Sequence, residues 1–174
     1  MSGLERRRAA LVVVDVQEAF RPYERFDAVA RASAKLLEGA RILGVPRVVT
    51  EQYPKGLGPT APEVGLTDEV PVTKTVFSAA RAEGFELGGA SQAILCGIET
   101  HVCVAQTALD LLEAGLEVQV IADAVGSRHA SDHERALVRL EGAGAVVSTV
   151  EAALFELLGA AGTPEFKAVQ GLIL

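Results

Sequence analysis

The amino-acid sequence predicts an α/β protein in which helices cover both faces of a parallel β-sheet. Short runs of apolar, β-branched residues alternate along the chain with longer segments of helical periodicity, which is the pattern of repeated βαβ units. The short runs are apolar throughout, as expected for strands that are buried on both faces. The chain has 174 residues, 49% of them hydrophobic, so we expect one domain over residues 1–174 with a three-layer αβα, Rossmann-like arrangement.

Six segments carry the strand pattern, and we expect them to form one parallel sheet in the order 3-2-1-4-5-6. They are AALVVVDV at 9–16, VPRVVTEQ at 45–52, VPVTKTVFSA at 70–79, QAILCGI at 92–98, LEVQVIADAV at 116–125 and the first part of AVVSTVEAALFELLG at 145–159.

Helical periodicity occupies most of the segments between the strands. The predicted helices lie at 26–44, 100–115, 131–144 and in the second part of 145–159. Asp27 is a candidate N-cap and Gly44 a candidate stop for the first helix, and Ser131 with Glu134 has the spacing of a capping box. Thr100 is the expected N-cap of the second helix.

Two further segments have a less regular pattern. YPKGLGPTAPEVG at 53–65 is rich in Gly and Pro and is therefore predicted to be a loop. The apolar tail TPEFKAVQGLIL at 163–174 is expected to dock onto the domain or to take part in a contact between subunits.

Composition and charge limit the classes of molecule that the protein is expected to bind. The formal net charge is -7, which disfavours binding to nucleic acid or to an anionic membrane surface. No apolar run approaches the ~18 residues that span a bilayer. Two cysteines, Cys96 and Cys103, do not make a disulfide framework. We therefore expect a soluble cytoplasmic protein whose partner is a small molecule.

Three polar residues stand where parallel α/β sheets form their sites, beyond the carboxyl ends of the strands. Asp15 ends the first strand, Lys74 lies in the third, and Cys103 lies in the first turn of the helix after the fourth. A helix N-terminus and a nearby lysine both favour a thiolate. Each residue also has a structural interpretation: apolar filling for Cys103, hydrogen bonding to loop amides for Asp15, and a solvated edge-strand side chain for Lys74. Cys96, inside a strand, fits apolar filling well.

Two other functions fit the first strand poorly. A phosphatase with an aspartyl nucleophile needs a second carboxylate two residues after Asp15, where Gln17 stands. A nucleotide-binding Rossmann domain needs a glycine-rich loop after this strand, and DVQEAFRP has no glycine.

The pieces VVVDVQEAF, VTKTVFSA, LCGIETHVCV and VIADAVGSR resemble, in content and order, the isochorismatase-like cysteine hydrolase superfamily. The loop TEQYPKGLGPTAPE is most similar to the branch called isochorismatase-domain-containing proteins. The resemblance implies a catalytic triad of Asp15, Lys74 and Cys103. It also implies an oxyanion hole formed by the backbone N–H groups of Glu99 and Cys103, and a cis peptide bond between Ile98 and Glu99.

The resemblance also guides what we expect of ligands. Nicotinamidases of this superfamily carry an Asp and two His after the second strand, whereas TEQYPKGLGPTAP has no histidine. We therefore expect neither a catalytic metal nor a cofactor. The expected walls of the substrate pocket are Gln17, Phe20, Tyr53, Phe77 and Thr100, although Phe20 and Phe77 suit core packing equally well.

The functional hypothesis is a metal-independent cysteine hydrolase that acts on a small carbonyl or amide substrate through a thioester. The alternative is a catalytically silent binding or assembly module with the same fold. In either case we expect a homo-oligomer. The sequence raises one geometric difficulty: in the predicted order the third strand lies two places from the first, yet Lys74 must reach Asp15.

Overall fold

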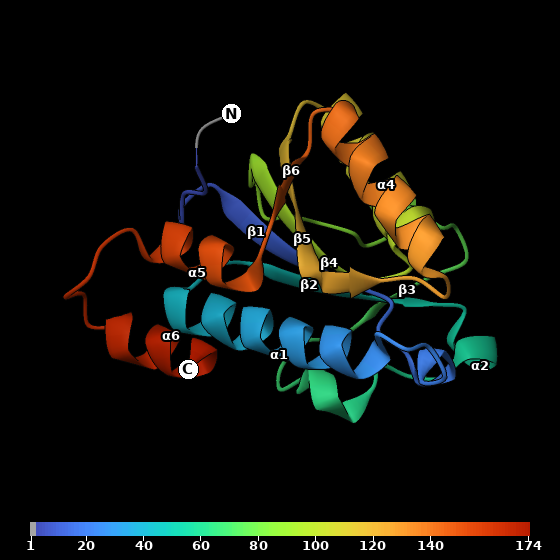
Figure 1. Ribbon diagram of the computed structural model, residues 1–174, viewed down its shortest axis with the longest axis horizontal. Coiled ribbons are helices and arrows are strands. Elements are labelled where there is room, and N and C mark those ends of the chain that lie inside the picture. The colour runs from blue at the N-terminus through green and yellow to red at the C-terminus, as the bar shows by residue number, and fades with distance from the viewer. Residues whose placement is uncertain (1–2) are drawn as a thin grey trace.

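The computed structural model describes residues 3–174 and arranges them in three layers, a central sheet with helices on both sides (Figure 1). Within these residues the sheet has six parallel strands in the order β3-β2-β1-β4-β5-β6. The strands are β1 (Ala9–Val14), β2 (Arg47–Gln52), β3 (Val72–Lys74), β4 (Gln92–Ile98), β5 (Glu117–Gly126) and β6 (Val146–Ser148). The predicted fold class and strand order are confirmed.

The helices join the strands in the expected α/β manner. They are α1 (Phe26–Leu43), α2 (Pro54–Leu57), α3 (Ala105–Glu113), α4 (Ala130–Gly142), α5 (Val150–Leu158) and α6 (Phe166–Ile173). Short 3-10 turns lie at η1 (Glu18–Phe20), η2 (Pro62–Val64) and η3 (Ala79–Arg81), and a π-helical turn, η4 (Thr100–Val104), precedes α3. Among residues 3–174, no helix is long and apolar enough to cross a membrane.

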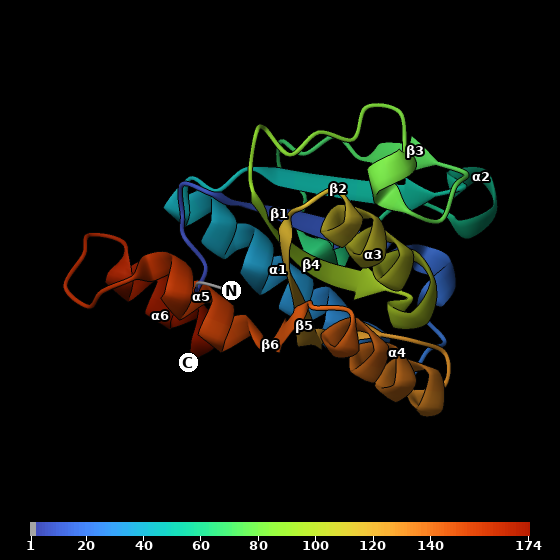
Figure 2. The same ribbon diagram turned by 90° about the horizontal axis from the view of Figure 1, so that it is seen from above.

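The sheet separates two hydrophobic cores. Figure 1 shows α1, α5 and α6 on one side of the sheet and α4 on the other, and Figure 2 shows α3 beside α4. In β1, Leu11 and Val13 pack into the core on the α1 side, whereas Val12 and Val14 pack into the core with α3. Because successive strand residues point to opposite faces, a strand covered on both faces must be apolar at every position.

Three predicted helix starts are wrong. Thr100 is the first residue of η4 and not an N-cap, because Glu99 precedes η4 as its N-cap and Val104 is the N-cap of α3. The N-cap of α1 is Arg25, with Asp27 inside the first turn. Helix α4 begins at Ala130 after His129, and no side chain caps it, so Ser131 lies within the helix and forms no capping box. The predicted stop at Gly44 is confirmed, because this residue adopts the left-handed conformation with φ 66° and its N–H bonds the last turn of α1.

The two less regular segments contain more structure than predicted. The loop at 53–65 includes α2 and η2, and Thr60 in this loop donates from its N–H and its hydroxyl to the carboxylate of Glu51. The tail forms α6, which packs against α1 and α5 with Val169 fully buried. The tail therefore docks onto the domain, although Leu174 at its end is almost fully exposed.

Gly97 brings the carboxyl ends of β1 and β4 together. It pairs with Val14 and adopts φ 119°. A Cβ atom at this position would lie 1.9 Å from the carbonyl oxygen of Val14, a clash with backbone that no side-chain motion relieves. Only glycine fits here, and the close approach places the residues after both strands side by side.

Candidate active site

Asp15, Lys74 and Cys103 converge at the carboxyl end of the sheet. Asp15 directly follows β1, Lys74 is the last residue of β3, and Cys103 lies in η4, the π turn after β4. All three are buried, and Cys103 keeps 7% of its surface exposed. Since π-helical turns occur frequently at functional sites, the position of Cys103 in this turn supports it as a candidate functional residue.

The carboxylate of Asp15 is held at both oxygens. The Nζ atom of Lys74 lies 2.7 Å from Oδ2, and the hydroxyl of Thr50 donates to Oδ1 at 2.7 Å. Residue 74 pairs with Gln52 in the neighbouring strand, so its long side chain reaches Asp15 across the end of β2. This geometry resolves the difficulty raised by the strand order.

The ammonium group of Lys74 has further acceptors besides Asp15. It donates to Oε1 of Gln52 at 2.7 Å, to the carbonyl of Phe77 at 2.9 Å and to the carbonyl of Val76 at 3.3 Å. A buried ion pair is retained without a large penalty only when additional hydrogen bonds satisfy both charges. The surroundings of Lys74 supply them, which fixes the cation and, through it, the carboxylate of Asp15.

The thiol of Cys103 is un-ionised at neutral pH. Burial, and next the negative charge of Asp15, raise the pKa of Cys103 to about 12, while Lys74 opposes this shift. The prediction of a lowered thiol pKa is therefore wrong, because desolvation and the carboxylate of Asp15 outweigh the effect of Lys74. A carboxylate near a neutral thiol is an arrangement in which a general base can activate a nucleophile.

Hydrogen bonds from neighbouring residues shape the π turn around Cys103. The N–H groups of Val102 and Val104 both donate to the carbonyl of Glu99, at 3.1 and 3.2 Å. The hydroxyl of Thr107 donates to the carbonyl of Cys103 at 2.7 Å. The peptide bond between Ile98 and Glu99, which precedes the turn, is cis.

The residues expected to line the substrate pocket differ in their exposure to solvent. Tyr53 and Phe77 are half exposed, and Tyr53 lines a cavity of about 470 Å³ together with Lys74. Phe20 instead packs against Tyr23, with ring centroids 5.3 Å apart, and against the core. Gln17 and Thr100 are fully buried.

Gln17 has a structural task that explains its burial. Its amide nitrogen donates to the carbonyls of Gln52 and Gly58, and its amide oxygen accepts from the N–H of Gln52. The side chain thus ties the end of β2 to the following loop. Thr50 and Gln52, the partners of Asp15 and Lys74, were missed in the sequence. The polar end of VVTEQ, beside Asp15 in the predicted strand order, was the available signal.

Two residues at the site have unusual backbone conformations. Asp15 has φ 51° and Tyr53 has φ 36°, and each directly follows a strand that ends at the site. Left-handed conformations are uncommon outside glycine, especially for a bulky residue. Such outliers gather at functional sites, which supports this end of the sheet as the active region.

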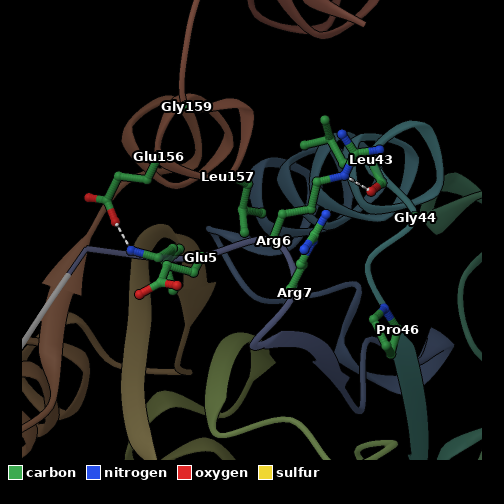
Figure 3. Close-up of a pocket in the computed structure, with 10 residues that line it drawn as sticks. Glu5, Arg6, Arg7, Leu43, Gly44, Pro46, Glu156, Leu157 and Gly159 are labelled. Carbon is green, nitrogen blue, oxygen red and sulfur yellow. Dashed lines mark hydrogen bonds between the residues drawn. The ribbon is translucent and has the colours of Figure 1, made fainter.

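A larger cavity lies elsewhere. It measures about 970 Å³ and is lined by the N-terminal arm and by the ends of α1 and α5 (Figure 3). Within it Arg6 donates to the carbonyl of Leu43, and Glu156 accepts from the N–H of Leu4. None of Asp15, Lys74 and Cys103 lines this cavity, so size alone does not identify the site. Within residues 3–174, no group of three or more His, Cys, Asp or Glu side chains is placed to hold a metal ion.

Residues 9–152 match the family model of the isochorismatase domain. The sequence is 44% identical over 181 residues to isochorismatase domain-containing protein 2 of Danio rerio, covering 99% of this chain and 92% of the relative. The fold is similar to that of MAR1 ribonuclease from Caenorhabditis elegans, with a TM-score of 0.91 and 42% identity over 99% of this chain and 92% of that one. It is also similar to the YcaC gene product of Escherichia coli, an octameric hydrolase of unknown specificity, with a TM-score of 0.84 and 27% identity over 92% and 84% of the two chains.

Proposed function

This chain belongs to the isochorismatase family, and on that premise we propose that it is a metal-independent cysteine hydrolase. Its substrate is a small carbonyl or amide compound, cleaved through a thioester on Cys103. One observation carries the proposal: a buried carboxylate, held by Lys74 and Thr50, lies near enough to the Cys103 thiol to raise its pKa.

The first step is proton transfer from the thiol to Asp15, coupled to attack on the substrate. Because the resting thiol is un-ionised, its proton leaves when the sulfur forms a bond to the carbonyl carbon. The carbonyl π electrons move to oxygen and create a tetrahedral oxyanion. General-base assistance of this kind contributes about 10²–10⁴-fold in rate.

The backbone N–H groups of Glu99 and Cys103 are the proposed donors to the oxyanion. Each well-placed donor lowers the barrier by about 3–4 kcal/mol. When the oxyanion collapses, the C–N bond breaks and Asp15 returns its proton to the leaving amine, which leaves the acyl group on sulfur. Asp15 then takes a proton from water, whose oxygen attacks the thioester, and the sulfur leaves with that proton as a thiol.

Lys74 acts in this scheme as a positioning residue. Its side chain is fully buried and bonded to Asp15, Gln52 and carbonyl oxygens, so it holds the charge and the orientation of the carboxylate. The cavity beside it has the half-exposed ring of Tyr53 in its wall, together with the charged side chains of Lys55, Arg81 and Glu83. Neither Asp15 nor Cys103 lines this cavity, so the proposal of a small carbonyl or amide substrate rests on the triad and not on the cavity.

Other functions have less support. A ribonuclease, the activity in the name of the C. elegans relative, would have to attract a polyanion to a chain with a net charge of -7. A silent binding module would not account for a buried ion pair placed near a buried thiol. Assembly into a homo-oligomer is compatible with hydrolysis, and we propose it in view of the octameric YcaC protein.

Replacement of Cys103 by Ala should abolish hydrolysis while leaving the fold intact. We would screen small primary and secondary amides for amine release, with a short RNA as a separate substrate class, using wild type, Cys103→Ala and Cys96→Ala. The expected result is at least one amide cleaved by wild type and Cys96→Ala, with a loss of roughly 10³-fold or more in Cys103→Ala. Amide cleavage that survives in Cys103→Ala would refute the mechanism, and cleavage of RNA alone would refute the substrate class.

A further inference from the structure

Three consecutive residues at the start of the π turn bond to the part of the chain that follows β5: Glu99 and His101 to the segment before α4, and Thr100 to His133 within α4. The carboxylate of Glu99 accepts from the N–H of Arg128 at 3.0 Å, Thr100 Oγ1 lies 3.0 Å from His133 Nδ1, and His101 Nδ1 lies 3.0 Å from Ser127 Oγ. Hydrogen bonds thus hold the turn that carries Cys103 to the segment after β5 and to α4.

The contact between Thr100 and His133 is the most buried of the three. Thr100 is fully buried and His133 is 9% exposed, whereas Glu99, Arg128 and His101 all reach solvent. A hydrogen bond between buried side chains contributes more to a defined geometry than an exposed one, because neither group has water as an alternative partner.

We propose that His133 is a positioning residue of the hydrolase, whose imidazole fixes Thr100 and thereby the turn that presents Cys103. Its effect on catalysis rests on the proposed function, whereas its effect on the turn does not. Thr100 is the first residue of the turn and follows Glu99, one of the proposed oxyanion donors. A shift of about 1 Å in such a turn can cost on the order of 100-fold in rate.

Burial, and next a neighbouring cation, keep the imidazole of His133 neutral at neutral pH. Burial, and next the cation of Arg25, lower the pKa of His133, while Glu134 opposes the shift. Arg25 is fixed there because its guanidinium donates to the carbonyls of Val125 and Ala122, each at 3.3 Å. Titratable groups also face His133 from the side of the turn. Glu99 accepts from the N–H of Arg128, and Nε2 of His101 lies 3.9 Å from the carboxylate of Asp132.

Protonation of His133 therefore changes the contact. The imidazolium would add a second cation beside Arg25, and its Nδ1 could only donate to Thr100. Because the folded-state pKa lies below the ordinary value of about 6.5, the neutral form persists at neutral pH and is lost only below that value. The hydrolysis rate should consequently fall on the acid side with an inflection that belongs to His133.

Matched substitutions separate the hydrogen bond from the volume of the side chain. Asn at 133 places an amide atom near the position of Nδ1 and does not titrate, whereas Gln places its amide near Nε2. At the other partner, Thr100→Ser keeps the hydroxyl and Thr100→Val removes it at nearly constant volume. Two readouts are needed: the hydrolysis rate against pH, and amide hydrogen exchange over residues 99–104.

We expect His133→Gln and Thr100→Val to slow hydrolysis by about tenfold or more and to speed amide exchange in the turn. The conservative variants His133→Asn and Thr100→Ser should hydrolyse substrate at rates within about threefold of wild type. The acid-side inflection should be absent in His133→Asn. Normal exchange in folded His133→Gln and Thr100→Val would overturn the proposal, as would equal damage by Asn and Gln. If exchange responds as expected in a protein that cleaves no substrate, the positioning contact stands and the proposed hydrolase function fails.

Discussion

Asp15→Asn should lower the free energy of unfolding by about 3 kcal/mol or more, because it leaves a buried ammonium without its counter-ion. The side chains of both Lys74 and Asp15 are fully buried, and their charged atoms are 2.7 Å apart. The same change removes the proposed general base, so hydrolysis should fall by about 10³-fold. An amide can still accept one hydrogen bond from Lys74, but it carries no charge.

Urea denaturation of wild type, Asp15→Asn, Lys74→Met and the double variant measures this effect. The double variant should be more stable than Asp15→Asn, because the methionine removes the unpaired charge and keeps most of the side-chain volume. An Asp15→Asn protein within about 0.5 kcal/mol of wild type, with an unchanged m-value, would show that the pair is not the buried unit described above.

Alkylation of Cys103 by iodoacetamide, without substrate, should be slow at neutral pH and should rise about tenfold per pH unit above it, because only the thiolate reacts. Its pKa is raised to about 12 by burial and by Asp15. Asp15→Asn should therefore speed alkylation, and Lys74→Met should slow it, since the lysine lowers the thiol pKa. The aspartate variant should thus lose hydrolysis while gaining reactivity at Cys103 alone. Unfolding would expose Cys96 as well, so slow labelling of Cys96 in the same sample separates the two causes.

The same pKa also predicts a dependence of stability on pH. Between the unfolded thiol value of about 8.5 and the folded value of about 12, the folded state keeps a proton that the unfolded state releases. Cys103 therefore contributes a loss of stability as the pH rises through this window. Cys96, fully buried and with its pKa also raised to about 12 by burial, shares the trend and is the internal control for unfolding during alkylation. An alkylation rate of Cys103 that levels off below pH ~8 would contradict the raised pKa and indicate a resting thiolate.

The fold was predictable because strands that are buried on both faces of a parallel sheet appear in the sequence as continuous apolar runs. The all-apolar AALVVV and QAILCGI segments form adjacent central strands. Because sites in parallel sheets form at the carboxyl ends of strands, the sequence also predicted that Asp15 and Cys103 lie close together. The helix at the tail was missed although Phe166, Val169 and Ile173 have helical spacing. The predicted capping box is absent because α4 begins at Ala130, which places Ser131 within the helix.

The partners of the site were less predictable because they depend on contacts between distant segments. Thr50 and His133 bond to Asp15 and Thr100 from elements far apart in the chain. The thiol pKa was predicted in the wrong direction for a related reason. A sequence shows that a helix terminus and a lysine are near Cys103, but it does not show how deeply the sulfur is buried or that Asp15 acts on it.

Capture of an acyl group on Cys103 is the most direct test of a thioester mechanism. With an amide that the wild type cleaves, the reaction would be quenched in acid during turnover, and the intact mass and the peptide masses would be measured in wild type and Cys96→Ala. We expect one acyl group, located on Cys103, that hydroxylamine removes and that Cys103→Ala does not acquire. Steady turnover with Cys103 unmodified at every quench time, together with undiminished turnover in Cys103→Ala, would contradict nucleophilic catalysis by this cysteine.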